Sequence, residues 1–205
     1  MSVTVINYDL GMGRWEPNAR GRLEQAALEL YGERGYEQTT VAEIAKRAGL
    51  TERTFFRHFA DKREVLFWGQ GALQELLVQA VADAPGSAAP IDAIAAALEA
   101  AGARFQERRE HSQQRHAIIA ANAELREREL IKLASLASAL ADALRLRGVT
   151  DPAASLAAEA GLAVFRIAFD RWISDTGRPD WAHVIRESMD ELKTVTAGSS
   201  RANTR

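Results

Sequence analysis

The sequence has 205 residues, of which 47% are hydrophobic and 26% charged, and its formal net charge is −2. This composition is normal for a soluble globular protein. Cysteine is absent from the sequence, which excludes disulfides and thiolate–metal sites. The chain begins with no basic segment leading into an apolar one, and no window approaches ~18 uncharged apolar residues. We therefore predict no signal peptide, no membrane partner and a cytoplasmic location.

The two ends of the chain show no sustained hydrophobic period. Residues 1–16 contain Gly11 and Gly13 and are predicted to form a flexible arm, and residues 197–205 are polar and predicted to be a disordered tail. A first helix is expected to begin near Pro17 and to end at Gly35. Its buried face has the spacing of an amphipathic helix and consists of Leu23, Ala26, Ala27, Leu30 and Tyr31.

Two short helices are predicted next. Thr40 and Glu43 form a capping-box pattern ahead of an apolar stripe, and Gly49 stops that helix. Thr51 is expected to cap a third helix, whose inner face carries Phe55 and Phe59 one turn apart.

The remaining pattern is also helical. Asp61 is expected to cap a fourth helix that runs without interruption to about Ala80, before a loop rich in proline and glycine. No segment alternates with period two, so we predict an all-α fold of about nine helices. The further expected helices cover about residues 91–109, 113–121, 123–147, 152–176 and 181–195.

Residues 17–62 match the helix-turn-helix pattern of three helices with short second and third members. Between Lys46 and Arg63 there are six basic residues and only two acidic ones. Opposite its aromatic face, the third helix would present Arg53, Thr54 and Arg57 to base edges in a major groove. Groups at helix N-termini would contact phosphates, namely Thr40, Thr51 and Lys62. The alternative is a solvated basic face of an ordinary helix.

Residues 18–68 resemble the DNA-binding domain of the tetracycline-repressor (TetR) family. The resemblance is carried by AALELYGERGYEQTTVAEIAKRAGLTERTFFRHFADKREVL. It implies that Thr40, Thr51, His58 and Lys62 hold phosphates and that Arg53, Thr54 and Arg57 face bases. Phe56 stands where the family often has a phosphate-binding Tyr, so that contact is lost or becomes apolar. Glu52 stands where Lys is frequent, so the operator sequence is open.

Residues 63–196 are predicted to form an effector-binding and dimerisation domain. The eighth helix is apolar nearly all round, so one face is expected to meet the core and another a partner subunit. The TetR resemblance implies that the last two long helices of each protomer form a homodimer interface. The residues expected there are Leu162, Phe165, Phe169, Trp181, Val184, Ile185, Ser188 and Leu192.

Aromatic and stray polar residues of the same domain are candidates for an effector pocket, although aromatic residues at helical spacing more often belong to a core. The candidates are Trp68, Phe105, Arg108, Arg115, His116, Phe165, Phe169 and Trp172. Arg104, Arg108, Arg109 and Arg115 favour an anionic ligand, such as an acyl-CoA or a carboxylate, unless they form a solvated face. His111 and His116 are five residues apart without a clear carboxylate partner, so neither a metal site nor a cofactor is predicted.

These features predict a regulator that binds a palindromic operator as a homodimer and responds to a small molecule, most simply a repressor. The fourth helix, starting at Asp61, would act as the lever between the two domains. Two alternatives stay open. One is a helical small-molecule-binding enzyme without a DNA role, for which the sequence shows no catalytic motif. The other is a DNA-binding activator, or a DNA binder that no small molecule releases.

Overall fold

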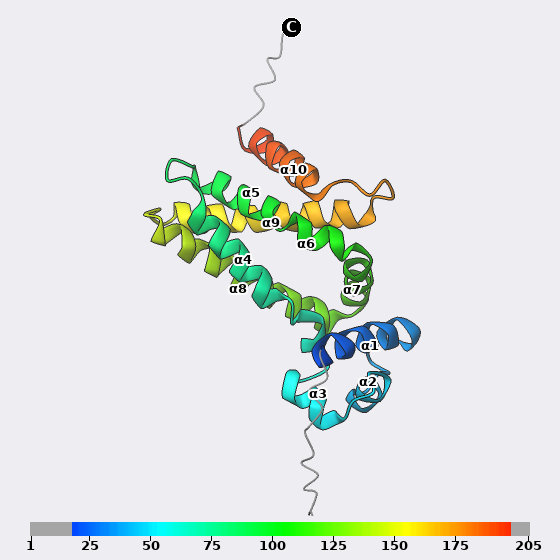
Figure 1. Ribbon diagram of the computed structural model, residues 1–205. Helices are drawn as coiled ribbons and strands as arrows, with labels where there is room; N and C mark the ends of the chain where they lie inside the picture. The colour runs from blue at the N-terminus through cyan, green and yellow to red at the C-terminus, as the bar shows by residue number, and fades with distance from the viewer. Residues whose placement is uncertain (1–17, 198–205) are drawn as a thin grey trace, which may run out of the picture.

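The structure is a computed structural model that describes residues 18–197, and within that range it is all-helical, as expected. The predicted arm 1–16 and residues 198–205 of the predicted tail lie outside the described residues. Figure 1 shows a small lower part and a larger helical part above it. The lower part contains α1 (Ala19–Arg34), α2 (Val41–Arg47) and α3 (Glu52–His58). The other elements are the 3₁₀ helix η1 (Glu64–Phe67), α4 (Gln70–Asp83), α5 (Pro90–Ala100), α6 (Gly102–Glu107), α7 (Arg109–Ala121), α8 (Ala123–Leu146), α9 (Ala153–Ser174) and α10 (Trp181–Thr196).

The caps predicted for the two short helices are present. The Thr40 hydroxyl accepts a hydrogen bond from the Glu43 backbone N–H, and the Glu43 carboxylate accepts one from the Thr40 N–H. The Thr51 hydroxyl accepts from the Thr54 N–H at the start of α3. Between α2 and α3, Gly49 has a φ of +67°, a conformation that side chains with a Cβ rarely adopt. These local bonds fix the angle at which α3 leaves α2.

Two expected helices are divided in the structure. The helix predicted from Asp61 to Ala80 consists of η1 and α4, because Val65, Leu66 and Phe67 are all buried and three consecutive residues cannot share one α-helical face. The helix predicted for residues 91–109 is interrupted at Ala101–Gly102 into α5 and α6. A Cβ on Gly102 would lie 2.9 Å from Cδ1 of Trp181, so the glycine permits the close approach of α10.

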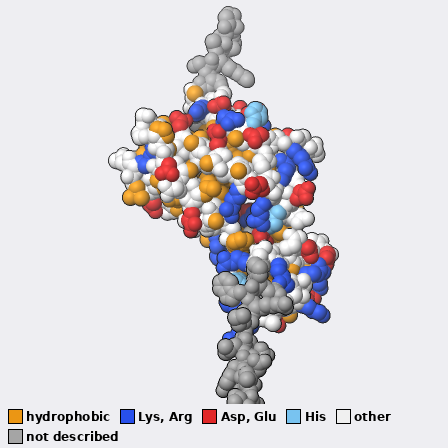
Figure 2. All heavy atoms as spheres, in the orientation of Figure 1, with side chains coloured by type: hydrophobic (Ala, Val, Ile, Leu, Met, Phe, Trp, Pro, Cys, Tyr) orange, Lys and Arg blue, Asp and Glu red, His pale blue; other side chains and the backbone are white. Residues whose placement is uncertain are grey.

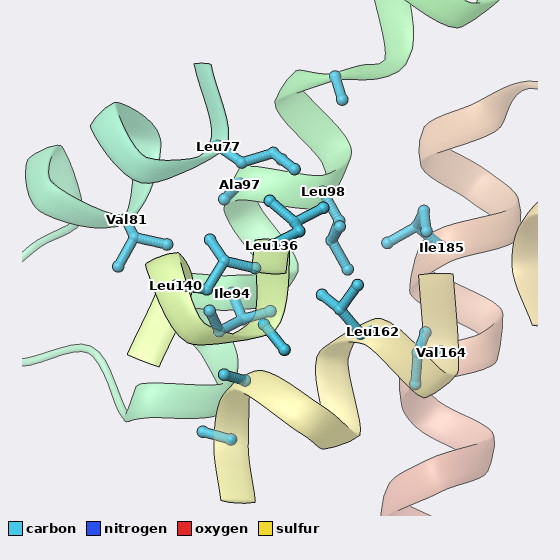
Figure 3. Close-up of a cluster of buried hydrophobic side chains, with 14 of the residues drawn as sticks. Leu77, Val81, Ile94, Ala97, Leu98, Leu136, Leu140, Leu162, Val164 and Ile185 are labelled. Atoms are coloured by element: carbon cyan, nitrogen blue, oxygen red, sulfur yellow. The ribbon is translucent and has the colours of Figure 1, made fainter. Parts of the chain in front are cut away.

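The larger core lies among α4, α5, α8, α9 and α10. Figure 3 shows side chains from all five helices pointing toward one another. Leu77, Ile94, Leu98 and Leu140 are each 0% exposed. Burial of this apolar surface is the main favourable contribution to folding of the upper part.

A second core joins the lower part to the upper one. It contains the apolar faces of α1 to α3 and the buried residues of η1, together with Ile118 and Ile119 of α7 and Leu125 of α8. The predicted boundary at residues 62–63 therefore crosses continuous packing. The apolar part of the interface between the two parts is formed by η1, α7 and the start of α8.

Candidate DNA-binding surface and ligand cavity

The third helix presents two arginines outward from a buried aromatic base. Phe55 is 0% exposed and Phe59 4% exposed, whereas Arg53 and Arg57 are exposed and form no ion pair with any described residue. Phe56 also lies at the surface, with 55% of it exposed. A helix fixed by its apolar face and free on its cationic face is the geometry needed to enter a major groove.

The predicted phosphate-binding residues have different environments. Thr40 and Thr51 are exposed, and their hydroxyls form the caps of α2 and α3. His58 is half-buried and lines a cavity above α3. Burial lowers the pKa of the His58 imidazole, and the positive charges of Arg20 and Arg57 lower it further, so the neutral form is favoured.

Lys62 points inward. Its ammonium group donates to the backbone oxygens of Tyr36 at 2.9 Å and Thr39 at 3.1 Å, and it lies 4.2 Å from the Tyr36 ring centroid. In this position Lys62 closes the loop between α1 and α2. Its role as a phosphate ligand remains a prediction, and the structure adds a bracing role that the sequence did not show.

A cavity of about 910 Å³ lies between the lower part and helices α4, α6, α7, α8 and α9. Seven of the eight predicted effector-pocket residues line it. Trp172 does not; it is 0% exposed and packs behind the cavity against Phe105 and Phe169. The seven lining residues are Trp68, Phe105, Arg108, Arg115, His116, Phe165 and Phe169.

The cavity wall is mainly cationic. It contains seven Lys or Arg side chains and four Asp or Glu side chains. Figure 2 shows basic side chains and a histidine gathered where the two parts of the molecule meet. The lining arginines that pair with no carboxylate of a described residue are Arg20, Arg104, Arg126 and Arg166.

One carboxylate bridges the two parts at the cavity. Glu24 of α1 is 7% exposed; its Oε2 lies 3.0 Å from Nη2 of Arg108, and its Oε1 lies 2.8 Å from Nε2 of His111. Burial alone would raise the pKa of Glu24, but His111, Trp68 and Arg108 outweigh it and lower that pKa below its ordinary value. The sequence prediction missed Glu24, although it lies beside Leu23 and Ala27 on the buried face of α1.

Two family models match the chain. Residues 24–67 match the model described as bacterial regulatory proteins of the tetR family, and residues 88–197 match the MftR C-terminal domain. The chain belongs to the TetR family of transcriptional regulators. As expected from its sequence, it therefore has a DNA-binding helix-turn-helix followed by a helical domain.

Curated relatives include two TetR-family regulators with different extents of similarity. The transcriptional regulator TcmR of Streptomyces glaucescens is 39% identical over 88 residues, which are 43% of this chain and 39% of TcmR. MftR of Mycobacterium tuberculosis, a regulator named for mycofactocin biosynthesis, is 26% identical over 172 residues, which are 82% of this chain and 86% of MftR. The TcmR match thus spans well under half of that relative's length.

Solved structures of TetR-type regulators share the fold. FadR of Bacillus subtilis, in complex with stearoyl-CoA, has a TM-score of 0.60 and 19% identity over 84% of this chain and 96% of FadR. PfmR of Thermus thermophilus has a TM-score of 0.51 and 27% identity over 88% of this chain and 99% of PfmR.

The residues predicted for the dimer interface of this TetR-family chain mostly pack within the protomer. Leu162, Trp181, Val184, Ile185 and Ser188 are each less than a tenth exposed, and the first four belong to the larger core. Phe165 and Phe169 line the cavity, and Leu192 is partly buried against the same core. The apolar face of α10 packs against α5 and α9 of its own chain. The subunit interface stays a prediction, and the burial of these residues within the protomer favours other faces of α9 and α10 for it.

Neither a metal site nor a membrane span was expected. Across residues 18–197 no group of three or more His, Asp or Glu side chains is placed to hold a metal ion. None of the helices in that range is long and apolar enough to cross a membrane.

Lys62→Met is expected to lower the free energy of unfolding by about 1–2 kcal/mol, because the backbone oxygens of the 36–39 loop lose a charged donor. Urea unfolding at pH 7 measures the loss. The salt dependence of DNA binding separates bracing from phosphate contact: bracing alone leaves the slope of log K against log salt unchanged, whereas a lost phosphate contact lowers it by about 1.

Glu24→Gln is expected to destabilise the protein at neutral pH and to reduce its sensitivity to acid. The pKa of Glu24 is lower in the folded state than its ordinary 4.5. Its ionised form therefore contributes stability that is present above about 4.5 and is lost as the pH falls through the lowered folded value. Urea unfolding at a series of pH values should show the difference between the two proteins shrinking on acidification. A constant difference would contradict the proposed pairing.

Proposed function

We propose that this TetR-family chain is a ligand-responsive repressor that binds a palindromic operator as a homodimer and releases it when an anionic small molecule enters the cavity. The observation that carries the proposal is the pairing of an outward cationic face on α3 with a large cationic cavity that shares His58 and Phe59 with the recognition segment. A ligand at that cavity touches the element that would hold DNA.

The chemistry of the cavity supports an anionic ligand with an apolar portion. Phe105, Phe165 and Phe169 supply aromatic surface, and the arginines without carboxylate partners supply donors for a carboxylate or phosphate. The solved FadR structure contains stearoyl-CoA, a ligand of this kind. An acyl-CoA or a free carboxylate is therefore the ligand class we propose.

The outer face of α9 supports a homodimer. Leu156 is 65% exposed and Ile167 60% exposed, and with Ala160 and Ala163 they form one apolar stripe at helical spacing. A second copy packed on this stripe would place two recognition helices across a two-fold axis, as successive major grooves ~34 Å apart require. The partner surface is thus the side of α9 opposite its buried face.

The test selects bound fragments from genomic DNA and then measures release. We expect an enriched palindromic sequence and a dimer by sedimentation. We also expect a monomer for Leu156→Glu/Ile167→Glu, and release of the operator on adding any small molecule that copurifies with the protein. Failure to enrich a sequence would overturn the proposal. Binding that no such molecule releases would favour the DNA binder without an effector.

A further inference from the structure

Four segments converge at the lower end of the cavity, where α1 and α3 meet the upper helices. Arg20 and Glu24 lie one turn apart on α1, and His58 ends α3. Trp68 follows η1, and Arg108 lies between α6 and α7. The Arg20 guanidinium carbon lies 5.5 Å from the Trp68 ring centroid and 6.0 Å from that of Phe59. These residues, here called the junction end, form one cluster. The side chains of Trp68 and Arg108 both interact with the Glu24 carboxylate.

Two buried polar atoms on residues that line this cavity have no hydrogen-bond partner among the described residues. They are Nε2 of His58 and Oε1 of Gln70. Leaving such an atom unpaired is unfavourable, because its bonds to water are lost and not replaced. Both residues belong to the same cavity wall, where Nε1 of Trp68 and Nε2 of His111 lie against the Glu24 carboxylate instead. A clustering of unmet hydrogen-bonding groups indicates a place for a polar group.

Charge at the junction end favours an anion. Arg20 pairs with no described carboxylate, and its guanidinium carbon lies near the rings of Trp68 and Phe59. A guanidinium carries five N–H donors, so it can bind a carboxylate or phosphate while it lies against aromatic rings. Arg104 donates to the Gly69 backbone oxygen at 3.3 Å and also has no described carboxylate partner. The remaining wall contains Phe105, Phe165 and Phe169, which offer apolar surface.

We propose that the junction end is a headgroup subsite, in which the carboxylate or phosphate of an amphipathic effector binds Arg20 and contacts His58 at the end of the recognition helix. This inference rests on the proposed function. It adds the place where the anion binds and the residue of the recognition helix that contacts it. The apolar portion of the effector then lies along Phe105, Phe165 and Phe169.

The subsite gives the effector a direct route to α3. An anion beside Arg108 competes with Glu24 for the same guanidinium and so weakens one of the contacts that hold α1 against α6 and α7. Its hydrogen bond to His58 acts on α3 itself. The ligand therefore favours the conformation in which Arg108 contacts the anion instead of Glu24. The ratio of the ligand's affinities for this conformation and for the DNA-binding one sets how far the population shifts.

The experiment measures probe binding to the full chain by calorimetry, without DNA. The probes are decanoate, decyl phosphate and decanoyl-CoA, with 1-decanol as the uncharged control. At least one anion is expected to bind about tenfold more tightly than 1-decanol, and comparing the three identifies the source of the headgroup. Arg20→Gln and His58→Ala are each expected to weaken that anion about tenfold, with the 1-decanol affinity unchanged. Arg20→Lys, which keeps the charge, should retain most of the affinity.

Matched controls lie outside the cavity. Arg34→Gln removes the same charge at the other end of α1, and His183→Ala removes an exposed histidine of α10. Both should bind the anion as the unaltered protein does. Circular dichroism and thermal unfolding establish that each variant is folded.

Three results would overturn the subsite: no preference for any anion over 1-decanol, undiminished anion binding by folded Arg20→Gln and His58→Ala, or loss only on Arg166→Gln. A protein that selects an operator yet gives one of these results keeps the proposed function and loses the subsite. A protein that binds the probes as expected but enriches no duplex loses the proposed function instead.

Discussion

Arg57→Ala is expected to weaken binding to the selected operator by about 1–3 kcal/mol and to relax specificity at one position in each half-site. Arg57 is exposed on α3 without an ion-pair partner among the described residues, and its helix is held by the buried Phe55. A guanidinium so presented can make a bidentate contact to guanine, and alanine removes both donors. Titration of a panel of operators, each with one base pair changed, measures the effect.

The control for this variant is Arg186→Ala, which removes an exposed arginine that pairs with Glu99 on the upper part of the molecule. It should bind every operator of the panel as the unaltered protein does. An equal loss across all sequences for Arg57→Ala, together with a lower salt slope, would instead identify Arg57 as a phosphate ligand.

The helix-turn-helix is the part of the fold that sequence reasoning predicted best. Its signals act over a few residues: the Thr40–Glu43 box, the Thr51 cap and the left-handed Gly49 each bond or turn within their own segment. Local rules of capping and spacing are sufficient there because no distant partner decides the outcome.

Distant contacts decided the features that the sequence did not predict. The helix expected from Asp61 to Ala80 is divided because Val65, Leu66 and Phe67 pack into the core shared with α1, whereas Leu77 of α4 packs into the larger core. Lys62 carries a charge typical of a phosphate ligand, but its ammonium donates to the backbone oxygen of Tyr36, which is 26 residues away in the sequence. Helix propensity and the spacing of apolar residues do not identify a partner so distant in the sequence.

The apolar composition of α9 and α10 could not distinguish a core from a subunit interface. Ile185 is 0% exposed inside the protomer, whereas Ile167 of the same pair of helices is 60% exposed. Both are apolar residues on helices of similar pattern, and only the packing of α5 shows which side is already covered. Seven of the eight residues predicted for the effector pocket line the cavity, and their role in binding an effector stays a prediction.

Gly161→Ala is expected to destabilise the upper part by about 1–3 kcal/mol, because a Cβ at this position would lie 2.2 Å from Cγ2 of Ile94. Gly161 of α9 is buried, and Ile94 of α5 is 0% exposed, so neither helix can give way into solvent. The absence of a side chain at Gly161 sets the spacing of the two helices. Thermal unfolding at fixed protein concentration should show a lower midpoint, by about 2–4 °C for each kcal/mol.

The matched control is Gly32→Ala on α1, where nothing lies within 4 Å of the added Cβ. There the higher helix propensity of alanine should leave stability unchanged or raise it by up to about 1 kcal/mol. Ile94→Leu moves the branch point away from α9, so Ile94→Leu/Gly161→Ala should lose less stability than the two single changes together. Additive losses would show that the methyl group of Ile94 does not limit the approach of α9, and that the destabilisation arises elsewhere on that helix.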